Sequence, residues 1–328
     1  MRRRDFRMRR SRFIAAAASI PLAMGSTVAA APPRAGRRVA FAYVPVLAAA
    51  PIMAANDRGY FADAGLDVEL ITIATAQDAI ALLARGRLDA AAGGLSAAFF
   101  NAVHRGFKVR LAGSLAWIPK RGHPTALLVR SDLYQSGLRT PQQLRGHRIG
   151  LIGGLGTASS YYLGALIAPL TFADVELIPL NGGDQGIALK RKSIAAAFAW
   201  NPFTQAFERG GIAKIVGLPA AQTCTSGTIF GERMLSEPAL AKALFSAVDR
   251  AITDIAGAGY YDPKNVAAFA KHTGQPASSL AQEDRYDYRP GMPIDRPTLD
   301  AMQRLFIAEK TLAYKTPVED SRLIWHRP

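Results

Sequence analysis

The chain of 328 residues contains a single cysteine, Cys224, so no intramolecular disulfide is possible and no CxxC metal or redox motif exists. The HExxH, GxSxG and P-loop patterns are absent as well. Histidine is scarce, and the five histidines lie far apart without the spacing of metal ligands: His104, His123, His147, His272 and His326. These absences leave no positive sign of catalysis. We therefore expect that the protein is not an enzyme and has no catalytic residue, metal site or cofactor.

The N-terminal segment lacks an apolar run long enough to cross a membrane. Phe13 to Met24 is apolar and rich in alanine, but its roughly twelve residues fall short of the roughly twenty that a hydrocarbon layer requires. The arginine-rich stretch Met1 to Arg12 precedes it, and small residues from Gly25 to Ala31 follow it. This three-part plan is that of a secretory signal peptide, with cleavage predicted near Ala30.

The arginines of this segment favour the twin-arginine export pathway over Sec. Arg3-Arg4-Asp5-Phe6 matches the pattern RRxF, although Arg7 stands where an apolar residue is usual. No cysteine lies near the cleavage point, which excludes a lipoprotein anchor. Residues 1–30 are therefore predicted to be a twin-arginine-type signal peptide and the mature chain a soluble periplasmic protein. The alternative, an amphipathic structural helix, is disfavoured because the apolar part has no polar face.

The formal net charge of +15 raises the question of a nucleic-acid partner. Residues 1–31 carry about +6 of this charge, which leaves about +9 for the rest of the chain. There the basic residues are scattered, with small clusters at Arg37-Arg38, Lys120-Arg121 and Lys190 to Lys192, and no basic motif interleaved with aromatic residues occurs. We expect a solvated basic surface and no nucleic-acid partner. The positive charge would slightly favour anionic ligands.

The stretch from Ala54 to Gly94 shows how the rest of the chain is organised. Asp67 to Ile73 alternates polar and apolar residues and predicts a strand, and Gln77 to Arg85 predicts a helix that ends before Gly86. Leu88 to Ala92 predicts a short buried strand that runs into a glycine loop. Alternating strands and helices indicate a partly parallel sheet with helices on both faces. Because 328 residues exceed what one core usually organises, two lobes are expected.

The segments GYFADAGLDVEL and AIALLARGRLDAA within this stretch resemble the nitrate, sulfonate, taurine and thiamine-pyrimidine binding proteins that feed bacterial ABC importers. The resemblance runs from about Val39 to Gly217 and includes Leu138 to Leu151, which is similar to the start of the second lobe in that family. It implies an α/β protein with the type II periplasmic binding protein fold, in which two α/β lobes enclose a ligand cleft. Lobe 1 would comprise residues 37–120 and 220–328, and lobe 2 residues 121–219.

Two loops are expected to contribute ligand contacts. Gly93 to Ser96 and Gly153 to Ser160 each follow a strand and precede a helix, and helix N-termini favour anions. The glycines leave backbone N–H groups accessible, and Thr157, Ser159 and Ser160 add hydroxyl donors. Ser96 could instead only cap its helix, and the second loop could also be a cap without a ligand. Gly154-x-Gly156 lacks the further glycine of a dinucleotide site.

Aromatic residues at strand ends are further candidates for the cleft, with core packing as the alternative. Trp200 ends a buried strand, and Asn201 stands where the resembling family often has a glutamate, so a carboxylate that could pair with an amino-bearing ligand is lost. Lys190 to Ser193 also replaces a glycine-containing turn of the family. The predicted ligand-binding residues are Tyr43, Ser96, Trp117, Thr157, Ser159, Ser160, Trp200 and Asn201.

The resemblance implies the periplasmic substrate-binding component of an ABC importer. It would capture a small organic anion, such as an aliphatic sulfonate, taurine or a nitrate-like oxyanion, and deliver it as a monomer to a membrane permease. An alternative ligand is a planar pyrimidine or aromatic carboxylate stacked on an aromatic side chain. A further alternative is an enzyme like the fungal pyrimidine synthases, which use an iron site with a cysteine-rich motif that this chain lacks.

Overall fold

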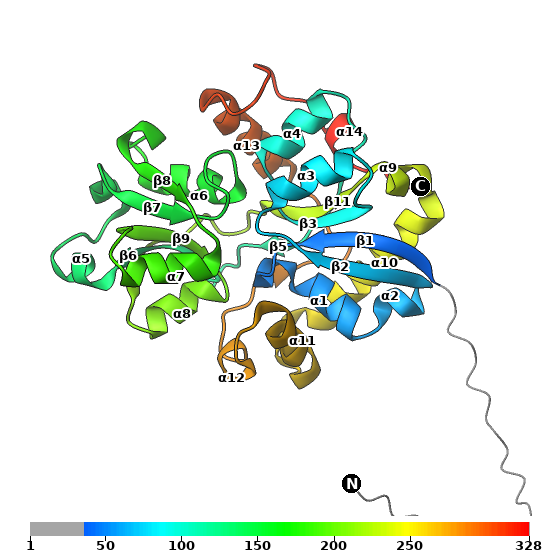
Figure 1. The fold of residues 1–328 in the computed structure, drawn as a ribbon, viewed down its shortest axis with the longest axis horizontal. Helices are drawn as coiled ribbons and strands as arrows, with labels where there is room; N and C mark the ends of the chain where they lie inside the picture. Colours follow the sequence, from blue (N-terminus) through cyan, green and yellow to red (C-terminus); the bar gives the residue numbers. More distant parts are fainter. Residues whose placement is uncertain (1–35, 328) are drawn as a thin grey trace, which may run out of the picture. The chain divides into compact units, whose positions relative to one another are not determined.

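The computed structural model describes residues 36–327, so the export signal predicted for residues 1–30 lies outside the described residues. Among the described residues, no helix is long and apolar enough to cross a membrane. Strands and helices alternate along most of the chain and build two five-stranded sheets (Figure 1).

The first sheet combines four strands from the N-terminal part of the described chain with β11, which follows the second sheet in the sequence. Its order is β2-β1-β3-β11-β4, where β1 pairs in parallel with β2 and β3, and β11 is antiparallel to β3 and β4. The strands are β1 (Arg37–Tyr43), β2 (Leu66–Thr72), β3 (Ala90–Gly94), β4 (Arg110–Ser114) and β11 (Ser226–Phe230). The strand predicted at residues 67–73 is thereby confirmed as β2, and the sheet is partly parallel as expected.

The second sheet uses strands from one continuous part of the chain. Its order is β10-β6-β9-β7-β8, with β7 parallel to β8 and β9 and with β6 antiparallel to β9 and β10. The strands are β6 (Thr125–Arg130), β7 (Arg148–Leu151), β8 (Glu176–Pro179), β9 (Ala196–Trp200) and β10 (Ala213–Gly217). The strands therefore divide between the sheets in the order that the two predicted lobes require, while the domain boundaries themselves stay a prediction.

Helices cover both faces of each sheet because successive side chains of a strand point to opposite faces. In the first sheet, Phe41 packs with α1 and α10, whereas Ala42 packs with α3, α4 and α13. In the second sheet, Phe198 belongs to a cluster with Tyr162 and Leu163 of α6, whereas Ala199 belongs to a cluster with Leu189 of α7 and Phe207 of α8. The helices named are α1 (Ala50–Asp57), α3 (Ala76–Ala84), α4 (Ala97–His104), α6 (Ala158–Ile167), α7 (Gly182–Lys190), α8 (Phe203–Arg209), α10 (Pro238–Ile255) and α13 (Arg296–Ala308).

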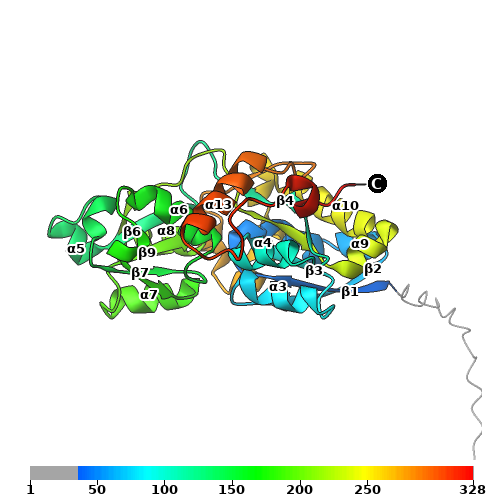
Figure 2. The same ribbon diagram turned by 90° about the horizontal axis from the view of Figure 1, so that it is seen from above.

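The remaining elements are short, apart from one helix. Figure 2 shows α13 close to α4, and the Phe100 and Phe306 rings of these helices lie 6.1 Å apart. The other helices are α2 (Tyr60–Asp63), α5 (Ser131–Gln135), α9 (Glu232–Ser236), α11 (Pro263–Thr273), α12 (Ala277–Leu280) and α14 (Asp320–Leu323). Single 3-10 turns are η1 (Leu47–Ala49), η2 (Pro141–Leu144), η3 (Phe172–Asp174) and η4 (Gly257–Tyr261).

A C-terminal segment, residues 283–288, joins the two sheets and is called the strap below. It ends in β12 (Asp287–Tyr288), which pairs with β5 (Ala116–Trp117) on the segment that leads from the first sheet to the second. The hydroxyl of Tyr286 lies 2.7 Å from Thr125 Oγ1 and donates to Pro124 O at 2.9 Å. Asn201 Nδ2 donates to Asp284 O at 2.9 Å. The strap thus bonds to β6 and to the residue after β9 in the second sheet, and to β5 on the segment that leaves the first sheet.

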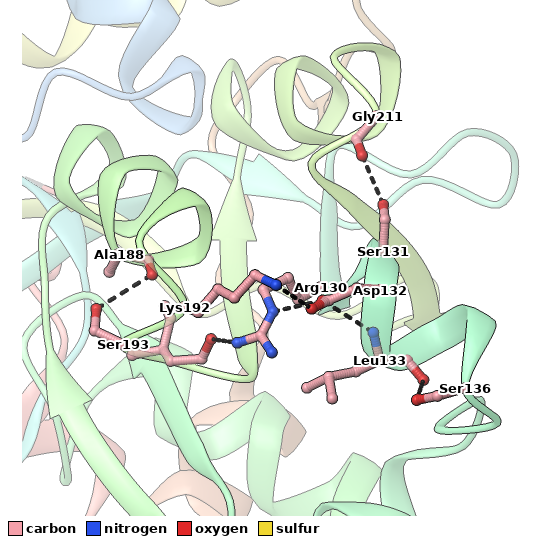
Figure 3. Close-up of polar contacts among 10 residues, drawn as sticks. Arg130, Ser131, Asp132, Leu133, Ser136, Ala188, Lys192, Ser193 and Gly211 are labelled. Atoms are coloured by element: carbon pink, nitrogen blue, oxygen red, sulfur yellow. Dashed lines mark hydrogen bonds and ion pairs between the residues drawn. The ribbon is translucent and has the colours of Figure 1, made fainter.

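The turn after α7 departs from the pattern of the resembling family. Lys192 occupies the glycine position and adopts a left-handed backbone with φ of +59°. Its Nζ lies 3.2 Å from Asp132 Oδ2, and Arg130 Nε donates to Asp132 Oδ1 at 2.5 Å (Figure 3). These two cations lower the pKa of Asp132 to about 2. An exposed ion pair here accompanies a backbone conformation that non-glycine residues rarely adopt.

Lys192→Gly is expected to raise the free energy of unfolding by about 0.5–1 kcal/mol. Relief of the left-handed strain, worth about 1–2 kcal/mol, exceeds the loss of an exposed ion pair worth about 0–1 kcal/mol. Urea unfolding measures the difference. Lys192→Ala is the matched control, because it removes the same ion pair but keeps a Cβ. A Lys192→Gly protein less stable than Lys192→Ala would contradict the expectation.

Candidate functional site

A pocket lies where the carboxyl ends of parallel strands from both sheets meet. It has a volume of about 50 Å³, which is room for about four water molecules. Ligands of open α/β sheets bind at this edge. The lining residues are Val44, Val46, Ala48, Ala49, Thr75, Ala76, Gln77, Gly93, Gly94, Ser96 and Ser226 from one half and Ile152, Thr157, Ala158, Ser159 and Trp200 from the other.

Several helix N-termini surround this pocket. Thr75, Ser96 and Thr157 are the N-caps of α3, α4 and α6, and Ala49 is the N-cap of α1. Thr75 belongs to a capping box with Asp78, whose Oδ2 accepts from Thr75 Oγ1 at 2.9 Å. The first turns of α3, α4 and α6 present backbone N–H groups, and their dipoles favour negative charge. α1 contributes less, because its Ala50 N–H is bonded to Leu47 O and Pro51 has no N–H. The arrangement therefore suits an anionic ligand.

Ser96 is 2% exposed, and among the described residues its Oγ has no hydrogen-bond partner. It is the N-cap residue of α4 by backbone position, yet its side chain makes no capping hydrogen bond. A buried hydroxyl without a partner is costly, and in proteins such groups are usually satisfied by protein, water or ligand atoms. Since Ser96 lines the pocket, a ligand oxygen is a suitable partner for it.

The loop before α6 uses its hydroxyls in two ways. Thr157 and Ser160 bond each other in a capping box, with Ser160 Oγ accepting from Thr157 N at 2.9 Å. Ser160 is fully buried and does not line the pocket. Ser159 Oγ accepts from Trp200 Nε1 at 2.9 Å, which leaves the Ser159 O–H free to donate. This bond also fixes the Trp200 indole in the pocket wall.

Two predicted aromatic residues lie away from the pocket. The Tyr43 hydroxyl is 2.7 Å from His272 Nδ1, and burial, with a contribution from the Asp57 carboxylate, raises the pKa of Tyr43. Trp117 packs under the guanidinium of Arg289, 3.8 Å from its ring centroid. Tyr43 and Trp117 therefore contact residues outside the pocket and do not line it.

Asn201 is fully buried, and its side-chain amide forms hydrogen bonds with nearby backbone groups. Its Nδ2 donates to Asp284 O at 2.9 Å, and its Oδ1 accepts from Gln205 N at 3.4 Å. The structure thus brings Ser96, Thr157, Ser159 and Trp200 together in the pocket, and it does not bring Tyr43, Trp117, Ser160 and Asn201 there. The ligand-binding role of each residue remains a prediction.

Sequence reasoning missed Thr75, Gln77, Ile152 and Ser226, all of which line the pocket. The Thr75-x-x-Asp78 capping box marks a helix start directly after β2 and could have identified the first two. Ile152 directly follows β7, as expected for a residue at this edge. Ser226 begins β11, the antiparallel strand with which the chain returns from the second sheet to the first, and no local signal marks it.

The two halves touch directly at the rim of the pocket. Ala97 N donates to Gly156 O at 2.8 Å, and Ser96 and Thr157 form an isolated antiparallel bridge. Gly94 lies so close to α6 that a Cβ on it would sit 2.9 Å from the Ala158 Cβ. The two halves can therefore approach this closely only because residue 94 is a glycine, which has no Cβ.

A model of the NMT1/THI5-like family matches residues 47–258. No curated protein sequence matches the chain. The alkanesulfonate-binding protein SsuA from Xanthomonas axonopodis pv. citri, solved with bound MOPS, is similar with a TM-score of 0.71 at 18% identity, covering 90% of this chain and 99% of that one. The periplasmic aliphatic sulphonate binding protein SsuA from Escherichia coli gives a TM-score of 0.69 at 18% identity, with 88% and 97% covered.

A third similar structure is the periplasmic nitrate-binding protein NrtA from Synechocystis PCC 6803, with a TM-score of 0.67 at 12% identity, covering 86% of this chain and 83% of that one. At these identities the similarities establish the fold. They confirm the prediction of an α/β, type II periplasmic binding protein fold.

Proposed function

Because the chain belongs to the NMT1/THI5-like family, we propose that it is the substrate-binding component of an ABC importer. The observation that carries the proposal is the pocket between the two halves, which is ringed by helix N-termini and contains the unpartnered hydroxyl of Ser96. The named relatives of this fold bind sulfonates or nitrate and are described as periplasmic. The protein would act in the periplasm as a monomer, with a membrane permease as its partner.

The ligand proposed for this pocket is a small organic anion such as an aliphatic sulfonate, or a nitrate-like oxyanion. Such an ion needs several hydrogen-bond donors and no obligatory arginine. Backbone N–H groups at the starts of α3, α4 and α6, together with Ser96 and Ser159, can supply them. Closure of the halves would surround the ligand and form the shape that the permease binds.

Trp200 favours a second candidate, a planar ligand such as a pyrimidine or an aromatic carboxylate. Its indole lines the pocket and is held by Ser159, so one ring face could stack on a planar molecule. This candidate uses the same pocket and differs in which ligands stabilise the protein.

A thermal-shift screen is expected to separate these candidates. A ligand at one hundred times its Kd should stabilise the folded state by about 2.7 kcal/mol, and we expect sulfonates to do so. The Ser96→Ala protein should show a smaller shift for the same ligand, with Kd raised about tenfold, because one buried hydrogen bond is lost. If pyrimidines alone raise the melting temperature, the planar candidate is correct. If no small anion or planar ligand raises it, the proposed function is wrong.

The alternative of an iron-dependent pyrimidine synthase rests on the wider family. The Cys224 Sγ lies 3.1 Å from Ala116 O and 3.2 Å from Ser226 O, so the thiol can donate its one proton to either carbonyl oxygen. Burial raises the pKa of this thiol to about 11, so it stays protonated, whereas a cysteine binds a metal as the thiolate. These contacts favour a packing role for Cys224. Tight stoichiometric binding of iron to the purified protein would support the enzyme.

A further inference from the structure

Within residues 36–327, no charged side chain lines the pocket. Its polar side chains are all neutral, namely Thr75, Gln77, Ser96, Thr157, Ser159, Trp200 and Ser226. A groove of about 310 Å³ adjoins it and shares Val44, Val46 and Ile152 with it. None of the groove residues is charged either: they are Val44, Pro45, Val46, Thr72, Ile73, Ala74, Ile152, Asn181, Gly182, Gly183, Phe203 and Thr273. In a chain with 20% charged residues, both spaces are thus free of charged side chains.

Two carboxylates follow lining residues in the sequence, and both are engaged in helix caps. Asp78 Oδ2 accepts from Thr75 N at 3.1 Å and from Thr75 Oγ1 at 2.9 Å. Asp184 accepts from Asn181 Nδ2 at 2.5 Å, and its backbone N–H donates to Asn181 Oδ1. These contacts hold the two carboxylates to their own helix starts, so neither is presented to a ligand in the pocket.

A pocket with these neutral donors and helix starts is expected to bind a negatively charged group better than a positively charged one. A single negative charge can be satisfied by N–H and O–H donors at the starts of α3, α4 and α6, where the dipoles also favour it. An ammonium group would lose its water without gaining a carboxylate, and the same helix dipoles would oppose it. The groove wall is largely apolar around Pro45, Ile73 and Phe203, which suits the hydrocarbon part of a ligand.

We propose that the ligand is an oxyanion with a single negative charge on an uncharged, largely apolar substituent, and that the pocket rejects the same molecule when it carries an ammonium group. The inference rests on the proposed function and narrows it, because it separates alkyl sulfonates from aminoalkyl sulfonates such as taurine. The oxyanion lies at the helix starts, and the substituent lies along the groove between Val44 and Ile152.

Ethanesulfonate and taurine form the test pair, since they differ only by the ammonium group. Calorimetric titration of the purified chain at pH 7.5 is expected to give a Kd for taurine at least about 100-fold higher than for ethanesulfonate. Propanesulfonate and 3-aminopropanesulfonate should show the same order. Taurine binding within about threefold of ethanesulfonate would overturn the inference while leaving the proposed function standing. Binding of neither sulfonate would overturn the inference, and the proposed function would fail as well only if no other small anion or planar ligand of the thermal-shift screen bound.

Gln77→Glu tests whether a carboxylate added to the pocket improves the binding of taurine relative to ethanesulfonate. Gln77 lines the pocket in the first turn of α3, where an added carboxylate is compatible with a helix start. The variant is expected to lower the ratio of the taurine Kd to the ethanesulfonate Kd at least about tenfold. Gln135→Glu, at an exposed position of α5, adds the same charge outside the pocket and should leave the ratio unchanged. An unchanged ratio in Gln77→Glu would show that pocket charge does not select the ligand.

Discussion

Replacement of Gly94 by alanine is expected to weaken ligand binding about 10- to 100-fold while the chain still folds. Gly94 ends β3 and faces α6 across the pocket rim, and its added Cβ would lie 2.9 Å from the Ala158 Cβ. Overpacking of this kind costs roughly 1–3 kcal/mol, and each 1.4 kcal/mol is about tenfold in affinity. The cost arises in the closed arrangement, because the clash is between the two halves. Gly94→Ala should therefore lower the ligand affinity more than it lowers the free energy of unfolding.

The matched rescue is Gly94→Ala combined with Ala158→Gly, which moves the methyl group from one side of the contact to the other. The double variant should recover most of the lost affinity in a calorimetric titration with the ligand identified in the screen. Small-angle scattering should show that Gly94→Ala is more extended than the parent chain in the presence of ligand. Unchanged affinity in the single variant would mean that the contact between Gly94 and Ala158 is not needed for binding.

Glu283→Gln is expected to remove about 2–3 kcal/mol from the loss of unfolding free energy between about pH 5 and pH 8. The Glu283 side chain is 1% exposed in the strap and pairs with Arg209 of α8. Its second carboxylate oxygen has no partner among the described residues. Asp284 adds a like charge beside it, and Tyr260 and Tyr261 are the neighbouring titratable groups on η4.

The sign follows from the direction in which the pKa of Glu283 moves on folding. Burial, opposed in part by Arg209, raises this pKa from its ordinary 4.5 to about 7. The folded chain therefore binds a proton that the unfolded chain has released. This stabilisation is complete below about pH 4.5 and is lost as the pH rises through 7. Each tenfold change in the proton dissociation constant corresponds to about 1.4 kcal/mol, which gives the expected size of the effect.

Urea unfolding of both proteins at pH 5 and pH 8 measures the effect. The parent should be less stable at pH 8 than at pH 5, and the difference between the two pH values should shrink in Glu283→Gln. Exposed carboxylates change little in this range and appear equally in both proteins. An equal pH dependence in the two proteins would show that Glu283 is ionised throughout.

The sequence pattern predicted the fold well where hydrophobic periodicity was strong. The strand at 67–73 and the helix at 77–85 are present as β2 and α3, each shifted by one residue. The two predicted glycine loops also meet at the pocket, because strand ends and helix starts must coincide at that edge of a parallel sheet. Local sequence therefore identified the right edge of both sheets.

Which side chains at that edge enter the pocket could not be predicted in the same way. Adjacent strand residues point to opposite faces, so Trp200 lines the pocket while Asn201 bonds to the strap. Tyr43 and Val44 differ in the same manner, with Tyr43 bonded to His272 of α11. These outcomes depend on partners more than 80 residues away in the chain, which local patterns do not contain.

The strand order of the first sheet also dictates when that sheet can be completed. In it, β4 is joined to β3 through β11, which belongs to residues 226–230, so residues 37–114 alone leave β3 with an open edge and β4 without its neighbour. The second sheet, formed by residues 125–217, can assemble earlier during synthesis. An exposed edge strand invites association with other chains until it is covered. A ribosome-bound or truncated chain that stops short of β11 should thus be the form most prone to aggregate.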